Sequence, residues 1–238
     1  MQIYQRFLTV FTGGLIIVAQ SYAAGSEQAS AALANLLAGS QYFQASFSQQ
    51  VRDANGELVD ESTGSMLLSR PGKLRWNIDS PIEQTIIVKG SEYLQYDRDI
   101  DQLIIQPLAD QLSAMPQLLL SGDQSAIERQ FAVTELRALA ASSASESAIR
   151  VFTLKPIGHS QLVSQSTNES QTPSSAQNDN LFAMLTLEFT GEQLQAIAIL
   201  DDLEQVSRFE FSDIDIRTPL AASVFDIDPP AGTDIIRR

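Results

Sequence analysis

The stretch that decides the fold is residues 64–78, which read GSMLLSRPGKLRWNI. Two short runs rich in apolar residues flank a Pro-Gly pair, a pattern typical of two β-strands joined by a tight turn. In the second run Leu74, Trp76 and Ile78 share one face, because successive side chains of a strand point to opposite sides. We therefore expect this face to be apolar and covered.

Similar runs extend the pattern on both sides. Phe43, Ala45 and Phe47 share one face of an earlier strand, and Asn55-Gly56 after it is a strong hairpin signal. The spacing between strands is too short for crossover helices, which excludes a parallel sheet and predicts an antiparallel meander. We expect further strands at about 62–70, 73–79, 84–89, 92–98, 101–106, 131–136, 148–155, 181–190, 193–200, 205–212 and 223–227.

Helical segments are few. Residues 26–41 form one amphipathic pattern, with Ser26 as the candidate N-cap and several leucines on one stripe. The strands are interrupted at 110–130, where we expect a helix that begins at Asp110 and stops at Gly122, with Pro116 kinking or splitting it. A second short helix is expected at about 123–129, which completes a helical pair.

Two further stretches complete the organisation. Residues 158–180 are rich in Ser, Gln, Asn and Thr with almost no apolar anchors, and this composition predicts a flexible polar loop between paired strands. No repeat of fixed period occurs. We therefore expect a single domain over residues 24–238, which combines a large antiparallel sheet, one N-terminal helix and the inserted helical pair.

The first residues are typical of a secretory signal. Arg6 precedes an apolar run over residues 7–19, and the small residues Ser21 and Ala23 permit cleavage after Ala23. The run is short for a membrane-spanning helix, although a short uncleaved anchor is the alternative. We therefore expect residues 1–23 to be a signal peptide and the mature protein to be exported and soluble.

The composition argues against several functional classes. There are 15 Lys and Arg against 29 Asp and Glu, so the net charge of −14 disfavours nucleic acid or an anionic membrane as the main partner. The chain has no Cys, which removes disulfides, Cys-ligated metals and thiol nucleophiles. One His leaves little for general-base catalysis or metal binding. We expect neither an enzyme nor a protein that needs a metal or cofactor.

The pattern of residues does not show what covers the apolar face of the sheet. A sheet must bury its apolar face against something. The expected helices are few and short compared with roughly ten strands. The sheet therefore either closes on a filled core or leaves an apolar concavity that the helices cover, and the residue pattern favours neither.

Several motifs occur in one characteristic order. They are residues 42–51 (YFQASFSQQV), residues 64–76 with the unit Arg70-Pro71-Gly72, the run 90–97, the Pro116-x-Leu118-Leu119 segment and the closing residues 225–235 (FDIDPPAGTDI). This ordered set resembles the LolA family of periplasmic outer-membrane lipoprotein carriers over essentially the whole mature chain.

The resemblance implies a fold and a function. The fold is an incomplete, strongly curved antiparallel β-barrel of about ten to eleven strands, with an N-terminal helix and a helical lid at 110–130. Such proteins take triacylated lipoproteins from an inner-membrane ATP-driven exporter of the LolCDE type and pass them to the outer-membrane receptor LolB. LolB shares the fold but is itself a lipoprotein, and the missing Cys argues against that identity. We expect a monomer in the periplasm.

The resemblance also implies a site. Arg70 corresponds to a latch that donates hydrogen bonds to main-chain carbonyls of the lid, here those near Leu120 and Ser121. An apolar cavity for acyl chains is expected to be lined by Phe43, Phe47, Met66, Leu68, Leu74, Trp76, Ile87, Leu94, Tyr96, Leu103, Met115, Leu118 and Leu119.

Other interpretations of the residues are weaker or remain as alternatives. Asp97, Asp99 and Asp101 open like a calcium-binding loop, but Gly and Glu are missing at its sixth and twelfth positions. His159 lies beside a serine in the polar loop, without the rigid scaffold that a catalytic triad needs. A lipid-sensing or lipoprotein-sensing regulatory module on the same half-barrel is the alternative function.

Overall fold

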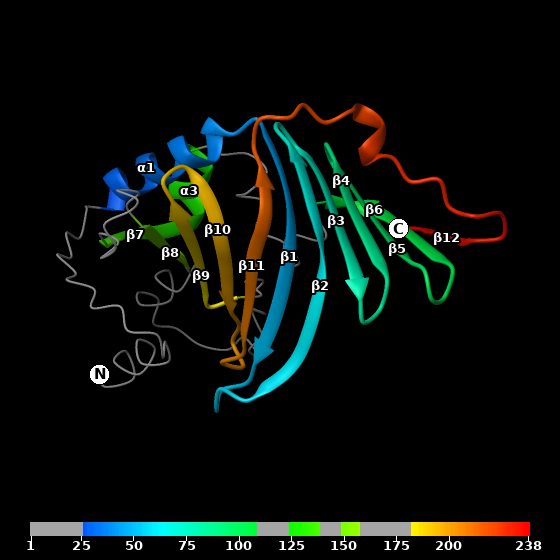
Figure 1. The fold of residues 1–238 in the computed structure, drawn as a ribbon, viewed down its shortest axis with the longest axis horizontal. Coiled ribbons are helices and arrows are strands. Elements are labelled where there is room, and N and C mark those ends of the chain that lie inside the picture. The colour runs from blue at the N-terminus through cyan, green and yellow to red at the C-terminus, as the bar shows by residue number, and fades with distance from the viewer. Residues whose placement is uncertain (1–25, 109–123, 139–148, 158–181) are drawn as a thin grey trace, which may run out of the picture.

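A computed structural model describes residues 26–108, 124–138, 149–157 and 182–238. Figure 1 shows one wide, strongly curved sheet with the two α-helices gathered at one end. The elements, in chain order, are α1 (Ser26–Gly39), β1 (Tyr42–Arg52), β2 (Leu58–Ser69), β3 (Lys73–Ser80), β4 (Gln84–Lys89), β5 (Glu92–Asp97), β6 (Gln102–Pro107), α3 (Gln124–Gln130), β7 (Phe131–Ala138), β8 (Ile149–Pro156), β9 (Met184–Thr190), β10 (Gln193–Leu200), β11 (Val206–Asp215), the 3₁₀-helix η3 (Ala222–Phe225) and β12 (Asp234–Arg237).

The strands form a single open sheet in the order β12-β6-β5-β4-β3-β2-β1-β11-β10-β9-β8-β7. β1 lies at the centre, between β2 and β11, and the edge strands β12 and β7 do not pair with each other. This confirms the expected mainly β, strongly curved and incomplete barrel, which has twelve described strands instead of ten or eleven.

The C-terminal segment corrects two expectations. β12 pairs in parallel with β6, with Ile235 opposite Leu103, so the sheet is not purely antiparallel. This pairing needs no crossover helix, because the segment after β11 runs past the ends of the strands, where η3 contacts β3 and β4, and is long enough to reach the far edge of the sheet. The strand expected at 223–227 is replaced by η3, where Phe225 is buried.

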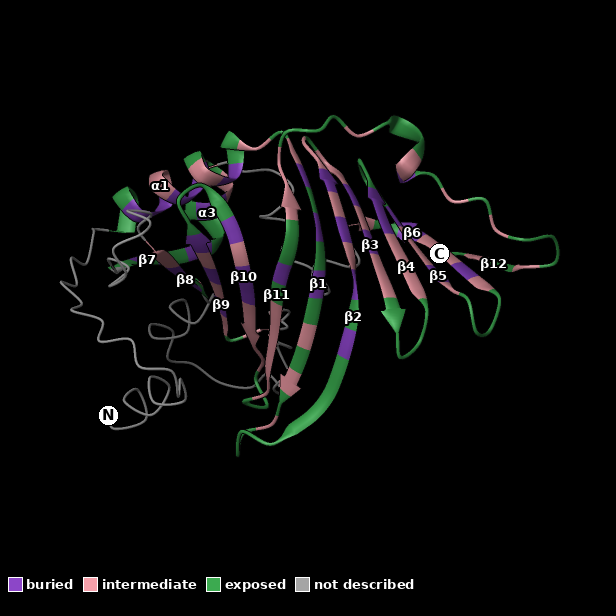
Figure 2. Cartoon of the chain, in the orientation of Figure 1, coloured by how far each residue is buried: buried purple, intermediate pink, exposed green. Residues whose placement is uncertain are grey.

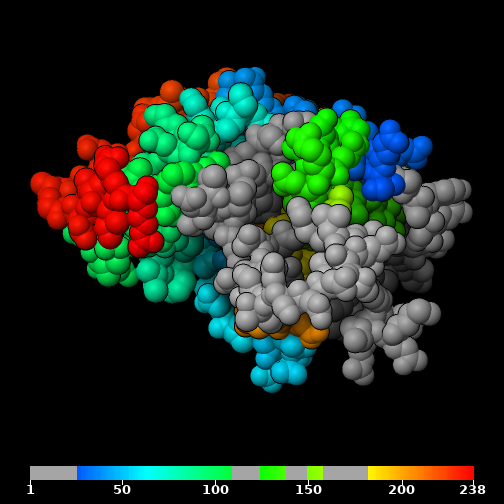
Figure 3. Space-filling view, turned by 180° about the vertical axis from the view of Figure 1, so that it is seen from behind, coloured from blue at the N-terminus to red at the C-terminus, as the bar shows by residue number. Residues whose placement is uncertain are grey.

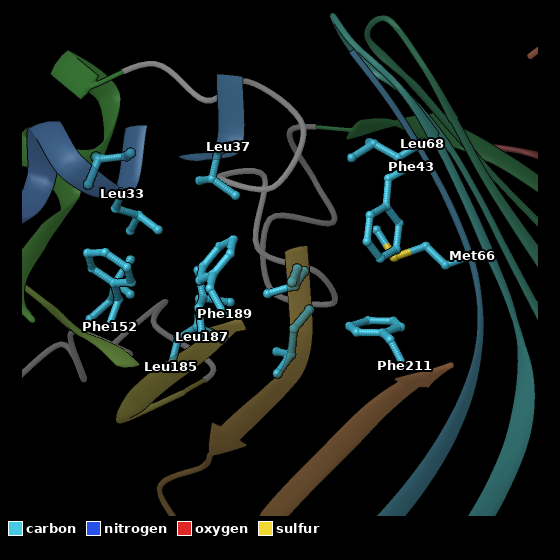
Figure 4. Close-up of a cluster of buried hydrophobic side chains, with 14 of the residues drawn as sticks. Leu33, Leu37, Phe43, Met66, Leu68, Phe152, Leu185, Leu187, Phe189 and Phe211 are labelled. Carbon is cyan, nitrogen blue, oxygen red and sulfur yellow. The ribbon is translucent and has the colours of Figure 1, made fainter. Parts of the chain in front are cut away.

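Strand alternation places the core on the concave face of the sheet. Along β1 the buried residues are Phe43, Ala45 and Phe47, and the residues between them are exposed. Figure 2 shows this alternation of buried and exposed positions along β1 and β2. α1 contacts α3 and β7, and Figure 4 shows its Leu33 and Leu37 pointing toward phenylalanines of the sheet.

A charged residue lies within this apolar face. The carboxylate of Glu135 in β7 is 1% exposed and accepts hydrogen bonds from Nε of Arg137 at 2.6 Å and Nε of Arg150 at 2.7 Å. The Arg150 guanidinium also lies 5.1 Å from the ring centroid of Phe152. Burial by itself raises the pKa of Glu135, but the two arginine hydrogen bonds outweigh it and lower that pKa.

Glu135→Gln tests this network. We expect a loss of about 1.5–3 kcal/mol of unfolding free energy at neutral pH, because charged hydrogen bonds are removed. The folded pKa of Glu135 is lowered, so its contribution exists above the unfolded pKa of about 4.3 and disappears as the pH falls through the folded value. Urea unfolding across the acidic range should therefore show the two stability curves converging, and a constant difference would contradict this account.

Candidate functional site

Six of the expected cavity residues share the concave face. The strand register puts Phe43 opposite Leu68, Met66 opposite Trp76 and Leu68 opposite Leu74, and these pairs point to the same side as Phe47. All six are buried, with exposed fractions between 1% and 6%. β1, β2 and β3 thus present one continuous apolar strip on this face.

Four other expected cavity residues lie on the opposite, convex face. Ile87 stands opposite Arg75 on β3 and Leu94 on β5, and Tyr96 stands opposite Leu103 on β6. Because Leu74 and Trp76 pair with the residues on either side of Ile87, the placement of Ile87, Leu94, Tyr96 and Leu103 in the cavity is wrong. They pack instead on the side where η3 contacts β3 and β4.

The concave positions of β4 and β5 are different residues. Ile86 and Val88 lie opposite Trp76 and Leu74, and Tyr93 follows opposite Val88. The expectation missed them because the run 86–88 is apolar throughout, so its alternation cannot be read from the sequence.

The concave face becomes polar toward β5 and β6. The Tyr93 hydroxyl donates to Gln95 at 3.0 Å, the Gln95 amide donates to Asp97 at 3.1 Å, and Gln84 also donates to Asp97. Burial and, to a smaller extent, the charge of Asp97 raise the pKa of Tyr93. The concave face is therefore amphipathic, with its apolar part on β1 to β4 and β7 to β11.

A small cavity lies where α1 ends over this apolar part. Its free volume is about 20 Å³, enough for roughly one water molecule. Figure 4 shows Leu37, Phe43, Met66 and Phe189 around this region, and Figure 3 shows this side of the molecule, where yellow atoms of the β9–β10 hairpin are visible at depth. The apolar residues Leu36, Leu37, Phe43, Met66, Leu68, Phe189, Leu194 and Ile216 line the cavity, with Ser40, Arg70 and Glu192 beside them. An acyl chain can enter only if these side chains move apart.

Arg70 lies at the end of this cavity. One of its terminal nitrogens donates a hydrogen bond to the carbonyl oxygen of Ser40, the residue that follows α1. Burial lowers the pKa of Arg70 to about 10, so it stays charged at neutral pH. A cation is favoured at the C-terminal end of a helix. Arg70 therefore fastens the end of α1 to the β2–β3 turn, a contact that the sequence does not reveal because its acceptor is a main-chain carbonyl.

Several expected features lie outside the described residues. They are the signal peptide at 1–23, most of the helical pair, the polar loop at 158–180, and Met115, Leu118, Leu119, Leu120, Ser121 and His159. The second helix of the expected pair is described and is α3.

The described part of the chain does not assemble the metal site that the acidic pattern at Asp97, Asp99 and Asp101 suggests. Within it, no group of three or more acidic or His side chains is placed to hold a metal ion. Asp97 instead accepts from glutamines, and Asp101 accepts from the Tyr96 hydroxyl at 2.8 Å. None of the described helices has the length and apolarity to cross a membrane.

A second, polar cleft of about 530 Å³ lies on the convex face, beneath the C-terminal segment. Arg75 crosses it and donates to the carbonyls of Val224 at 3.1 Å and Asp226 at 3.3 Å. Lys89 forms an ion pair with Asp226 at 2.5 Å. These contacts hold the C-terminal segment on the sheet, and the charged lining does not suit acyl chains.

Known proteins resemble the chain along nearly its whole length. The family model described as LolA, outer membrane lipoprotein carrier protein, matches residues 38–167. A relative from Chromohalobacter salexigens, called outer-membrane lipoprotein carrier protein, is 31% identical over 227 residues, which are 95% of this chain and 93% of the relative. A relative of the same name from Pseudomonas aeruginosa is 31% identical over 230 residues, 97% of this chain and 98% of the relative.

A solved structure supports the fold alone. The crystal structure of an uncharacterized conserved protein from Thermus thermophilus aligns with a TM-score of 0.52 and 14% identity, over 90% of this chain and 99% of that protein. Together with the family model and the two relatives, these matches lead to one assignment: the chain belongs to the LolA family of outer-membrane lipoprotein carrier proteins.

Proposed function

We propose that this protein carries lipoproteins across the periplasm by sheltering their acyl chains on the concave face of the sheet. The observation that carries the proposal is a continuous apolar strip, which includes Phe43, Met66 and Trp76, in a chain that belongs to a family of lipoprotein carriers. The side chains of the strip are buried, and the cavity at its end near Arg70 has free volume for about one water molecule.

Capture of acyl chains is energetically easy. Each methylene group moved from water into an apolar environment contributes about 0.8 kcal/mol. Three acyl chains therefore supply far more free energy than is needed to separate the side chains around Leu37 and Met66. The demanding step for a carrier is release.

The closed cavity favours release. When cargo leaves, the apolar side chains regain contact with one another, so the empty protein does not expose them to water. A closed form that binds acyl chains poorly lowers the affinity of the whole population for cargo. Lipoprotein then passes to a receptor whose apolar site is better formed.

Arg70 stabilises the closed form in this proposal. Its hydrogen bond to Ser40 ties α1 to the sheet beside the cavity, and the carbonyls near Leu120 and Ser121 are its proposed further acceptors. Hydrogen bonds from a charged donor contribute about 1.5–3 kcal/mol. That range biases a two-state opening without locking it.

The rest of the proposed pathway follows from the same assignment. The mature, monomeric, single-domain protein over residues 24–238 acts in the periplasm after removal of residues 1–23, and it works without catalysis, metal or cofactor. It receives triacylated lipoproteins from an inner-membrane exporter of the LolCDE type and delivers them to LolB.

Arg70→Leu tests the latch. We expect the variant to take up lipoprotein from spheroplasts as a soluble complex but to transfer it to outer membranes at least about tenfold less efficiently, because the closed form is weakened. Arg75→Leu is the matched control, since Arg75 also donates to main-chain carbonyls but on the convex face. Equal transfer by both variants would remove Arg70 from the mechanism.

Depletion separates the carrier from the alternative of a regulatory module. If the protein is a carrier, outer-membrane lipoproteins accumulate in the inner membrane when it is depleted, and this is measured by fractionating the two membranes. Normal lipoprotein sorting together with altered envelope gene expression would contradict the carrier function and support the regulatory one.

A further inference from the structure

We propose that an aromatic cluster formed by Phe47, Trp76 and Phe209 ends the apolar strip and limits the length of acyl chain that the protein accommodates. The inference rests on the proposed carrier function and adds a specificity-determining element to it. It follows from the direction of the strip, the packing of the cluster and the change to polar residues beyond it.

The strip runs along β1 and β2 away from the small cavity. Phe43 and Leu68 line the cavity together with Met66, which pairs with Ala45 at the inner end of the cavity, and Phe47 follows opposite Gly64. These pairs span four residues of strand, a distance of about 13 Å. A chain that enters at the cavity therefore meets Met66, an adaptable side chain, before it reaches Phe47.

The aromatic cluster is tightly packed. The ring centroids of Phe47 and Trp76 are 4.4 Å apart with an interplanar angle of 31°. The Phe209 ring meets both others edge on, with centroids 5.8 Å from Phe47 and 5.1 Å from Trp76. The two edge-on separations lie within the range of favourable aromatic pairs, about 4.5–7 Å, and the Phe47–Trp76 rings are at its short limit. The three rings come from strands β1, β3 and β11 and so extend across the strip.

Gly64 gives the Phe47 ring its position. A Cβ atom on Gly64 would lie 2.7 Å from Cζ of Phe47 and 1.9 Å from the carbonyl oxygen of Asn77, both closer than real contacts allow. The ring therefore occupies the space that a side chain on β2 would fill. Beside this glycine the β2–β3 register skips Asp79, and such irregularities increase the local bend of a sheet.

On β1 to β4 the concave face turns polar directly beyond the cluster, whereas on β9 to β11 it stays apolar through Ile197 and Leu187. On β1 and β2 the next inward pair is Gln49 and Ser62, and the Ser62 hydroxyl donates to the Gln49 amide oxygen at 2.7 Å. Across β3 and β4 the pair Ile78 and Gln84 leads to the hydrogen bond between Gln84 and Asp97. An acyl chain that passed the rings would have to separate these polar pairs.

This arrangement predicts that affinity rises with acyl-chain length up to one particular length, the break, and then stays constant. Each additional methylene that fits between the cavity and the rings raises affinity about fourfold. Once the chain end reaches Phe47, further methylenes gain nothing. The small side chain of Ala45 keeps the path open. A larger residue at position 45 should therefore shorten the chain length at which affinity stops rising, and a smaller residue at position 47 should lengthen it.

The test uses triacylated cysteine lipopeptides that differ only in having hexanoyl, octanoyl, decanoyl, lauroyl, myristoyl or palmitoyl chains, with affinity measured for the full mature protein. We expect the affinity of the unaltered protein to rise and then level off within this series. Phe47→Ala should move the break to longer chains, and Ala45→Leu should move it to shorter ones. Phe43→Ala is the control, because it should weaken binding of every chain alike without moving the break.

The possible results separate the length limit from the carrier function. An unchanged break in both Phe47→Ala and Ala45→Leu would overturn the length limit while leaving the carrier function intact. Absence of lipopeptide binding by the unaltered protein would overturn the carrier function and the limit with it. Thermal unfolding shows which variants fold, and if Phe47→Ala does not, the milder Phe47→Leu takes its place with the same expected direction.

Discussion

An apolar face as wide as this sheet has to be kept from water while the protein is empty, and the other features of the structure depend on that constraint. Alternation along β1 to β3 points Phe43, Met66 and Trp76 to the same side, and α1 covers part of that side with Leu33 and Leu37. The result is a core with free volume for about one water molecule near Arg70. A carrier that closes in this way keeps the apolar side chains of this face buried when unloaded, yet can exchange contacts among them for contacts with cargo.

The two faces of the sheet have different roles: the concave face carries the apolar strip, and the convex face holds the C-terminal segment. The concave face is apolar over the central strands and polar toward β5 and β6. The convex face carries Arg75 and η3, which hold the C-terminal segment against the sheet so that β12 can pair with β6. This segment covers Ile87 and its neighbours, and it explains why β4 is apolar on both sides. Opening of the concave face can therefore proceed while the outer face stays fastened.

The inward residues of a strand could be predicted from the sequence where the other face of that strand meets solvent. On β1 the residues between Phe43, Ala45 and Phe47 are polar, so the inward set could be read directly. On β4 the run 86–88 is apolar throughout because a segment distant in sequence covers its outer side, so the sequence does not distinguish the outward Ile87 from the inward Ile86 and Val88. The parallel pairing of β12 depends on that same distant segment. The Ser40 acceptor of Arg70 has no sequence signature, since every residue has a carbonyl group.

The central claim is that acyl chains replace side-chain contacts on the concave face. Trp76 is the single tryptophan of the chain and lies on that face, so its fluorescence reports the event without labelling. The most direct measurement is quenching of Trp76 by a lipopeptide whose acyl chains carry bromine near their ends. The account predicts saturable quenching that an unbrominated lipopeptide reverses by competition. Binding of the brominated lipopeptide, shown by co-elution, without any quenching of Trp76 would contradict it.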